Sequence, residues 1–87
     1  MRMERDALKF AKGALALCPE LEGDQLDAIA DFAYNLGLGN LKASTLRKVL
    51  NEGDMEEAKV QLARWVYAGG RRLRGLELRR SAEAALL

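Results

Sequence analysis

The chain contains no histidine, a single cysteine (Cys18) and a single proline (Pro19) among its 87 residues. A lone cysteine cannot close an internal disulfide, and the absence of histidine removes one of the two residue types that build most zinc sites. We therefore predict no metal site and no cofactor. The scarcity of proline, and the lack of any run rich in valine, isoleucine and threonine, favour helices over strands.

Long apolar stretches are missing as well. No run approaches the ~20 residues that a helix needs to cross a bilayer, so we predict no membrane span. Hydrophobic residues nevertheless make up 49% of the chain, which is enough for one core. A chain of this length folds as one unit, so we predict a single helical domain over residues 1–87.

The net charge of +1 is unevenly distributed along the chain. Residues 1–57 carry 7 basic and 11 acidic side chains, whereas residues 58–87 carry 7 basic and 2 acidic ones. The positive end could face an anionic polymer, either a nucleic acid or the bacterial cell wall. From charge alone, a solvated helix face is the simpler interpretation.

Apolar residues recur at helical spacing in five segments. These predicted helices cover about residues 4–17, 24–36, 41–51, 55–68 and 73–86. Short connectors with glycine or aspartate join them, which predicts an all-α fold: a compact bundle of about five helices with no sheet.

Capping and breaking residues support these boundaries. Pro19 ends the first helix, and Gly37 and Gly39 fit the left-handed backbone that closes the second. We predict that Asp24 caps the second helix and Asn40 the third. Asp54, with Glu57 three residues later, predicts a capping pair at the start of the fourth.

Three segments together resemble one known family. They are QLDAIADFAYNLGLGNLKAST at 25–45, RWVYAGGR at 64–71, and an L-x-G-L-x-x-R-R-x-A-E pattern at 73–83. In this order they resemble the C-terminal lobe of phage-type lysozymes, the endolysins of glycoside hydrolase family 24. The resemblance runs from about Asp6 to Leu87. One departure is Arg74, which stands where the family often has proline.

This resemblance implies a lysozyme-like C-terminal lobe with peptidoglycan as its substrate. The complete enzymes cleave the bond from N-acetylmuramic acid to N-acetylglucosamine. By the same resemblance, we expect synthesis in the cytoplasm of the host bacterium and action at the periplasmic cell wall.

The catalytic motif of the family is absent from this chain. Glycosidases need an acid to protonate the leaving oxygen and usually a second carboxylate. The family is known by a glutamate, an aspartate or cysteine nine residues later, and a threonine six residues after that. The only threonine is Thr45, and the two preceding positions are Ala30 and Gly39. We therefore assign no catalytic residue, expect the glutamate-bearing lobe before Met1, and expect the chain alone to be nearly inactive.

Carboxylate pairs do occur elsewhere in the sequence. Asp27 with Asp31, and Glu56 with Glu57, are the most obvious. Both pairs fall on the outer faces of predicted helices, where solvated carboxylates keep their ordinary acidity. They are weak candidates for catalysis.

The resemblance implies a substrate-binding groove wall. Its residues are Tyr34, Asn35, Thr45, Gln61, Trp65 and Arg71. An aromatic face with amides and hydroxyls suits a saccharide, and a guanidinium can grip the carboxylates of stem peptides.

Purely structural interpretations of these groove residues remain open. Tyr34 can cap the core with its hydroxyl in water, and Ser44 and Thr45 can simply cap a helix. Gln61 alone is a surface glutamine, and the helical phase of Trp65 favours a place in the core.

Two other classes of function compete with this interpretation. A nucleic-acid module would use surface charges on two helices: Lys42, Arg47 and Lys48 on the third, and Arg79 and Arg80 on the last. The near-neutral chain lacks a strong basic stripe, so we predict no nucleic-acid partner. The alternative is a regulatory or interaction protein derived from a lysozyme lobe. It would bind itself, as a homo-oligomer, or an intact or complementary lysozyme half. The expected surface is the side of the first helix and the start of the second, and it includes Leu8, Phe10 and Leu21.

Overall fold

The computed structural model describes the backbone of residues 2–87 and the side chains from Leu8 onward. Within this part, the helices are α1 (Arg2–Leu17), α2 (Asp24–Leu36), α3 (Leu38–Ala43), α4 (Thr45–Asn51), α5 (Met55–Leu62) and α6 (Arg74–Ala84). The strands β1 (Tyr67–Ala68) and β2 (Arg71–Arg72) form one short antiparallel hairpin. The predicted all-α bundle is confirmed as a class, because helices make up almost all of the regular structure.

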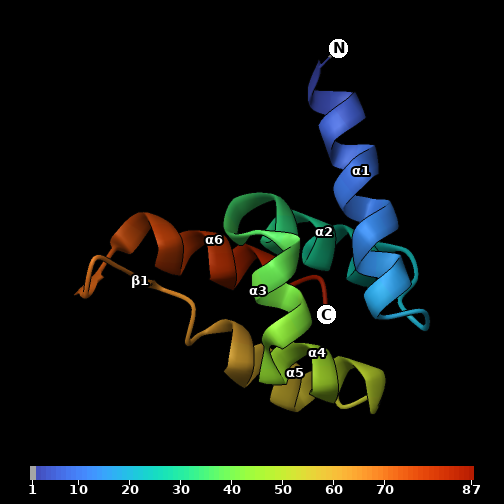
Figure 1. Cartoon of the computed structure of the whole chain (residues 1–87). Coiled ribbons are helices and arrows are strands. Elements are labelled where there is room, and N and C mark those ends of the chain that lie inside the picture. Colours follow the sequence, from blue (N-terminus) through green and yellow to red (C-terminus); the bar gives the residue numbers. More distant parts are fainter. Residues whose placement is uncertain (1) are drawn as a thin grey trace.

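Helix α2 occupies the centre of the arrangement. It packs against α1, α3 and α6, while α4 and α5 pair with each other below it (Figure 1). The hairpin projects to one side, between α5 and α6. The buried residues of α2, Ala28, Ile29, Phe32 and Ala33, fall on one face of the helix and enter the core.

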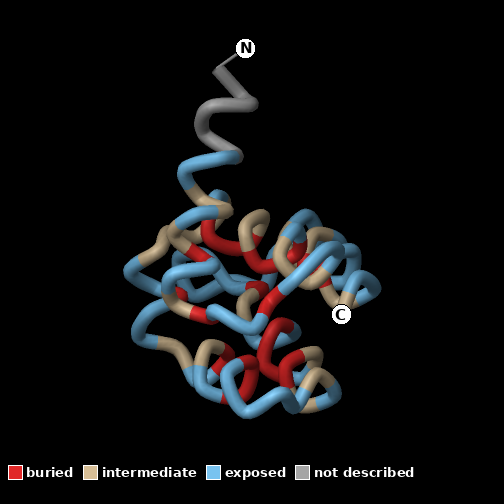
Figure 2. Tube along the Cα trace, turned by 90° about the vertical axis from the view of Figure 1, so that its right-hand side faces the viewer, coloured by how far each residue is buried: buried red, intermediate tan, exposed pale blue. Residues whose placement is uncertain are grey.

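One hydrophobic core runs through the bundle, and buried stretches from several helices meet there (Figure 2). Its members are Ala14, Cys18, Leu21, Ile29, Phe32, Ala33, Leu41, Leu46, Val49, Leu50, Ala58 and Leu62. The radius of gyration is 12.1 Å, close to the ~12 Å expected of a compact domain of this length.

The predicted third helix is wrong as a single element. It begins earlier, at Leu38, and breaks at Ser44, which adopts an extended backbone with φ −88° and ψ 154°. The Ser44 hydroxyl donates to Leu41 O at 2.7 Å and accepts from Arg47 N at 3.1 Å. A serine side chain that bonds to the backbone on both sides competes with the helical ladder, and here it ends one helix and caps the next.

The predicted fourth helix is too long, and the prediction of no sheet is wrong. Helix α5 ends at Leu62, and the chain turns into the hairpin, where Tyr67 pairs with Arg72. Gly69 and Gly70 have φ of 59° and 78°. Two consecutive positive φ angles make the tight turn that joins antiparallel strands, and a Gly-Gly pair adopts them without strain.

The predicted caps have mixed outcomes. The Asp54 cap of α5 is confirmed, since its carboxylate accepts from Glu57 N at 3.1 Å. Asp24 is the first residue of α2 and does not cap it, and Asn40 lies inside α3, where its amide donates to Leu36 O at 2.5 Å. Gly37 has φ 100°, so the positive φ predicted there at the end of α2 is confirmed. The same prediction for Gly39 is wrong, because the chain re-enters a helix at Leu38 and Gly39 lies inside α3 without a positive φ.

Candidate functional site

Two neighbouring arginines of α6 reach across to two residues of α2 that lie one helical turn apart. Arg79 donates to both carboxylate oxygens of Asp31, at 2.9 and 3.2 Å. Arg80 Nη2 donates to Asn35 Oδ1 at 3.0 Å. Residues four apart lie on the same helix face, so these contacts join the two helices along one edge.

Arg80 is the most completely enclosed polar side chain of this contact. It is only 2% exposed, and its guanidinium carbon lies 5.3 Å from the centre of the Phe32 ring. Its Nη2 also donates to Glu83 Oε2 at 2.7 Å, and its Nε lies 2.7 Å from Glu83 Oε1. Its Nη1 reaches Trp65 O at 3.5 Å. The guanidinium therefore joins α2, the end of α6 and the segment after α5.

The pKa values of the two carboxyl groups at this site, Glu83 and Asp31, are shifted in opposite directions. The pKa of Glu83 is raised to about 8: burial is the main cause, a hydrogen bond with Asp31 adds to it, and Arg80 acts in the opposite direction. For Asp31, burial pushes the pKa upward, but hydrogen bonds from Glu83 and Arg79 and the arginine charges outweigh it, so the pKa falls below its usual range.

A carboxyl group with a raised pKa is the usual mark of a general acid. Glu83 fails the geometric requirement for that role. It is 2% exposed, and both of its oxygens lie 2.7 Å from Arg80 nitrogens. A glycosidic oxygen cannot come within hydrogen-bond distance of it, so we assign Glu83 a structural part.

The structure connects two of the predicted groove residues directly through Arg80. These are Asn35, held by its side chain, and Trp65, held by its carbonyl oxygen. The Trp65 indole is half-buried and meets the Phe32 ring edge-on, with centroids 5.3 Å apart. The predicted core position of Trp65 is therefore partly right: one side of the indole packs on the core.

Tyr34 lies next to Asn35 near the end of α2 and is 41% exposed. Its ring meets Phe10 of α1 edge-on, with centroids 5.5 Å apart. Phe10 thus supports the ring from one side and leaves much of it in solvent.

The other three predicted residues are more scattered. Thr45 is exposed as the first residue of α4, and Arg71 is exposed in β2. Gln61 is only 8% exposed, and its amide donates to Glu57 Oε2 at 2.8 Å. Gln61 is therefore not the surface glutamine that its sequence position alone suggests.

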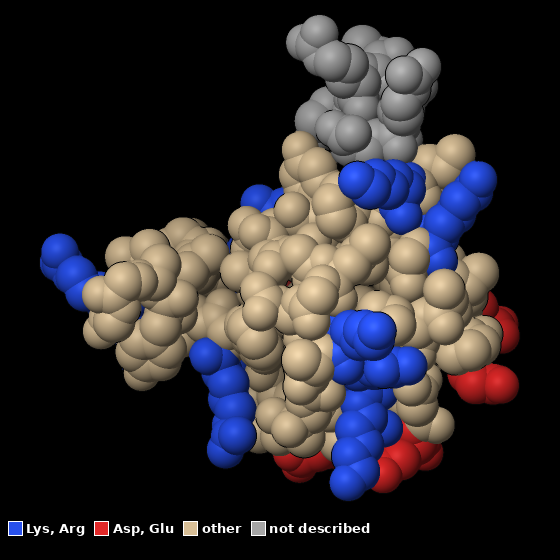
Figure 3. Space-filling model, in the orientation of Figure 1, with Lys and Arg blue, Asp and Glu red and all other residues tan. Residues whose placement is uncertain are grey.

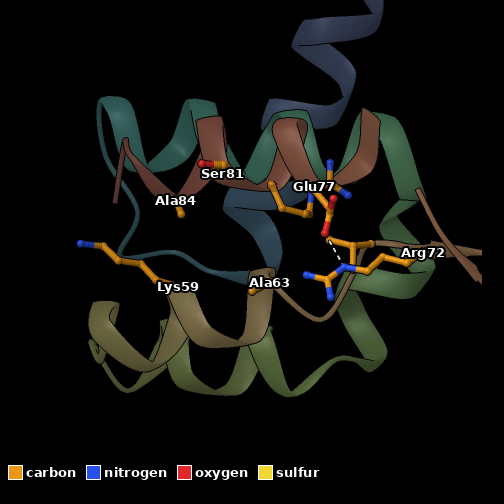
Figure 4. A pocket seen from close by; sticks show the side chains of 8 residues that line it. Lys59, Ala63, Arg72, Glu77, Ser81 and Ala84 are labelled. Atoms are coloured by element: carbon orange, nitrogen blue, oxygen red, sulfur yellow. Dashed lines mark ion pairs between the residues drawn. The ribbon is translucent and has the colours of Figure 1, made fainter. Parts of the chain in front are cut away.

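A cavity of about 310 Å³ opens between α5, α6 and the hairpin (Figure 4). Lys59, Ser81, Ala84 and an ion pair between Arg72 and Glu77 line it. None of the predicted groove residues contributes to it, although Arg80 forms part of its wall.

Charge is dispersed on the face that Figure 3 shows. Lysine and arginine side chains occupy separate places over the hairpin and the helices, without a continuous stripe. Among the residues with described side chains, no three acidic or cysteine groups converge to hold a metal ion. In the same part of the chain, none of the helices is long and apolar enough to cross a membrane.

Fold and site together describe a small helical domain in which a buried arginine holds the Asn35 side chain and the Trp65 carbonyl oxygen at one edge. The family model for phage lysozyme matches residues 2–83. A SAR-endolysin of Bacteriophage PS119 is 48% identical over 56 residues, which cover 64% of this chain and 34% of that protein. The endolysins of Bacillus phages PZA and B103 are 42% and 39% identical over 82 residues, 93% of this chain.

The chain therefore belongs to the phage lysozyme family. It spans about a third of the length of these relatives, since the matched segments cover 31–34% of each of them.

Sequence analysis did not predict the contacts of Arg79 and Arg80 with α2, although part of the pattern that indicates them was present. Arg79, Arg80 and Glu83 stand in the quoted L-x-G-L-x-x-R-R-x-A-E pattern, and the spacing from Arg80 to Glu83 places both on one helix face. That spacing predicts a contact between the two, but their burial depends on α2 and on the Trp65 segment.

Proposed function

We propose that this chain provides the saccharide-facing lobe of a phage-type lysozyme and binds the glycan strands of peptidoglycan. The observation that carries the proposal is the join of Asn35 and Trp65 through Arg80, in a chain of the phage lysozyme family. A side-chain amide and an indole fixed at one edge offer a sugar both hydrogen bonds and apolar surface.

The groove wall extends outward from this pair. Tyr34 adds a half-exposed ring beside Asn35, and Thr45 adds an exposed hydroxyl at the start of α4. Arg71 in the hairpin would meet the carboxylates of stem peptides. Gln61 contributes its free carbonyl oxygen, because its nitrogen is engaged by Glu57. One wall leaves a sugar largely exposed, so we expect a Kd on the order of millimolar, about 4 kcal/mol.

Cleavage of the glycan needs a second lobe. The glutamate motif of the family is not found in this chain, and the carboxyl with the raised pKa is sealed beneath Arg80. One wall of the groove can position the sugar but cannot transfer a proton to it. General acid–base catalysis raises the reaction rate about 10²- to 10⁴-fold. In the complete enzyme, the partner lobe would carry the acid, and the reaction would take place at the wall of the host bacterium.

The surface that would meet such a partner lies on α1, which rises away from the rest of the bundle (Figure 1). Leu8 is 55% exposed there, and Phe10 is half-buried beside Tyr34. Leu21, which we expected on the same surface, is instead a core residue. We infer that Leu8 and Phe10 contact the complementary lobe, or a second copy when that lobe is absent.

Tryptophan fluorescence offers a direct test, because Trp65 is the only tryptophan. Titration with soluble muropeptides should change its emission saturably, with a midpoint in the millimolar range. Tyr34→Ala should weaken binding severalfold. Leu15→Ala removes a side chain of similar exposure, 40% against 41%, from α1 and serves as the control. No emission change up to tens of millimolar, or equal weakening by both variants, would sink the proposal.

A further inference from the structure

We propose that Arg80 is a positioning residue that turns the Asn35 amide outward as a hydrogen-bond donor, so that the site selects N-acetylated sugars over their free amines. The inference deepens the proposed function and rests on it. It requires that Asn35 faces the glycan, and it adds that the glycan meets the nitrogen of the Asn35 amide and not its oxygen.

The orientation follows from the chemistry of the two groups. A guanidinium carries only hydrogen-bond donors, so the Asn35 amide must turn its accepting oxygen toward Arg80. Arg80 Nη2 has two hydrogens, and its two acceptors are Asn35 Oδ1 at 3.0 Å and Glu83 Oε2 at 2.7 Å. A flipped amide would set donors against donors beside a fully buried charge, which is costly in a medium without water.

Arg80 itself cannot turn away to accommodate a flipped Asn35. Its Nε is held against Glu83 Oε1 at 2.7 Å, and its plane lies by the Phe32 ring at 5.3 Å. Its Nη1 points at Trp65 O. The amide of Asn35 is therefore oriented by a residue that is itself only 2% exposed.

The nitrogen of the Asn35 amide is not engaged by the described part of the protein. Among the described side chains and backbone groups, none accepts a hydrogen bond from Asn35 Nδ2, and the residue is half-buried. Where Asn35 faces the glycan, as the proposed function requires, its amide nitrogen has two N–H donors to offer. A donor at a fixed place favours ligand groups that only accept.

A sugar offers three kinds of group at this position. Hydroxyls both donate and accept, so a fixed donor does not discriminate among them. The carbonyl of an acetamido group only accepts, and the ammonium of a deacetylated amino sugar only donates. Asn35 in this orientation therefore favours the acetamido sugar, and the charge of Arg80 behind it disfavours the ammonium as well.

The test compares two soluble probes on the intact chain. One is a β-1,4-linked oligomer of N-acetylglucosamine, and the other is its deacetylated counterpart, with binding followed by Trp65 emission. The wild type should bind the acetylated oligomer at least about tenfold more tightly. Asn35→Asp keeps an oxygen for Arg80 but replaces the outward donor with an acceptor, so it should lose about tenfold for the acetylated oligomer and gain for the amine.

Matched variants separate orientation from charge and from folding. Gln25→Glu makes the same amide-to-acid change at the start of α2 and should leave the ratio of the two affinities unchanged. Arg80→Lys keeps the charge but cannot hold Oδ1 and Glu83 together, and where it remains folded the ratio should fall towards one.

Each outcome decides one claim. If neither oligomer nor muropeptide binds the wild type, the proposed function fails, and this inference fails with it. If the wild type binds acetylated sugar but Asn35→Asp keeps the wild-type ratio, Asn35 only ties α2 to α6 and the inference is overturned while the proposed function stands.

Discussion

The buried carboxyl of Glu83 should make the stability of this domain fall as the pH rises through neutrality. Its pKa is raised from the ordinary 4.5 to about 8. The folded state therefore holds a proton that the unfolded state has released between these values, and its stabilising contribution is complete below about pH 4.5 and is lost as pH rises through 8. Asp31 acts in the opposite sense, because its pKa is lowered and its contribution is lost only as pH falls through the acidic range.

The magnitude follows from proton linkage. One proton bound only by the folded state changes the unfolding free energy by up to about 1.4 kcal/mol per pH unit. A domain of 87 residues has about 4–13 kcal/mol in total, at roughly 0.05–0.15 kcal/mol per residue. A loss of even 2 kcal/mol between pH 5 and pH 8 would thus be a large fraction and easy to measure.

Urea unfolding at several pH values from 5 to 8.5 is the appropriate assay. The wild type should lose stability steadily over this range. Glu83→Gln, which mimics the protonated acid and has no carboxyl proton to lose, should show a nearly flat profile. Glu77→Gln changes a more exposed carboxylate of α6 and should keep the wild-type slope. A wild-type profile as flat as that of Glu83→Gln would refute the reasoning.

Three further predictions concern caps, backbone and catalysis. Ser44→Ala should lower the unfolding free energy by about 1 kcal/mol in urea, because it removes the cap of α4, whereas Ser81→Ala should change it little. Gly37→Ala should cost about 1–3 kcal/mol, since its φ of 100° and ψ of 146° suit glycine alone, whereas Gly39→Ala in α3 should be neutral or stabilising. The purified chain should not lyse chloroform-treated Gram-negative cells at the rate of an intact endolysin, and lysis at that rate would show that a catalytic group has been overlooked.

The sequence predicted correctly those helix ends that depend only on residues close together in the chain. The Asp54 cap and the end of α2 at Gly37 depend on a few neighbouring atoms, and both were predicted correctly. Asn40 was assigned as a cap from its residue type alone. The chain re-enters a helix directly at Leu38, so its amide instead bonds to the last carbonyl of α2.

The hairpin was predictable but was missed. Gly69 and Gly70 were interpreted only as a helix stop, although two glycines between an aromatic and a charged segment also predict a tight turn between strands. Tyr67 pairs with Arg72, whereas α5 already ends at Leu62. Trp65 therefore lies between α5 and the hairpin and not on the helix from which its core position was predicted.

The polar site could be predicted only in part. The resemblance placed Asn35 and Trp65 on one groove wall, and the structure joins them. The joining residue, Arg80, was considered only as a surface charge of the last helix. Its burial depends on Phe32 and Glu83 closing around it, which is a tertiary arrangement that spacing along one helix does not reveal.

Backbone amide shifts during titration with soluble muropeptides test the central claim most directly. If this chain is the saccharide-facing lobe of a phage lysozyme, the shifts should cluster at residues 34–37, at Trp65 and around Gly69, and should saturate in the millimolar range. Shifts confined to α6, or none at tens of millimolar ligand, would contradict the account and leave an interaction protein as the remaining interpretation.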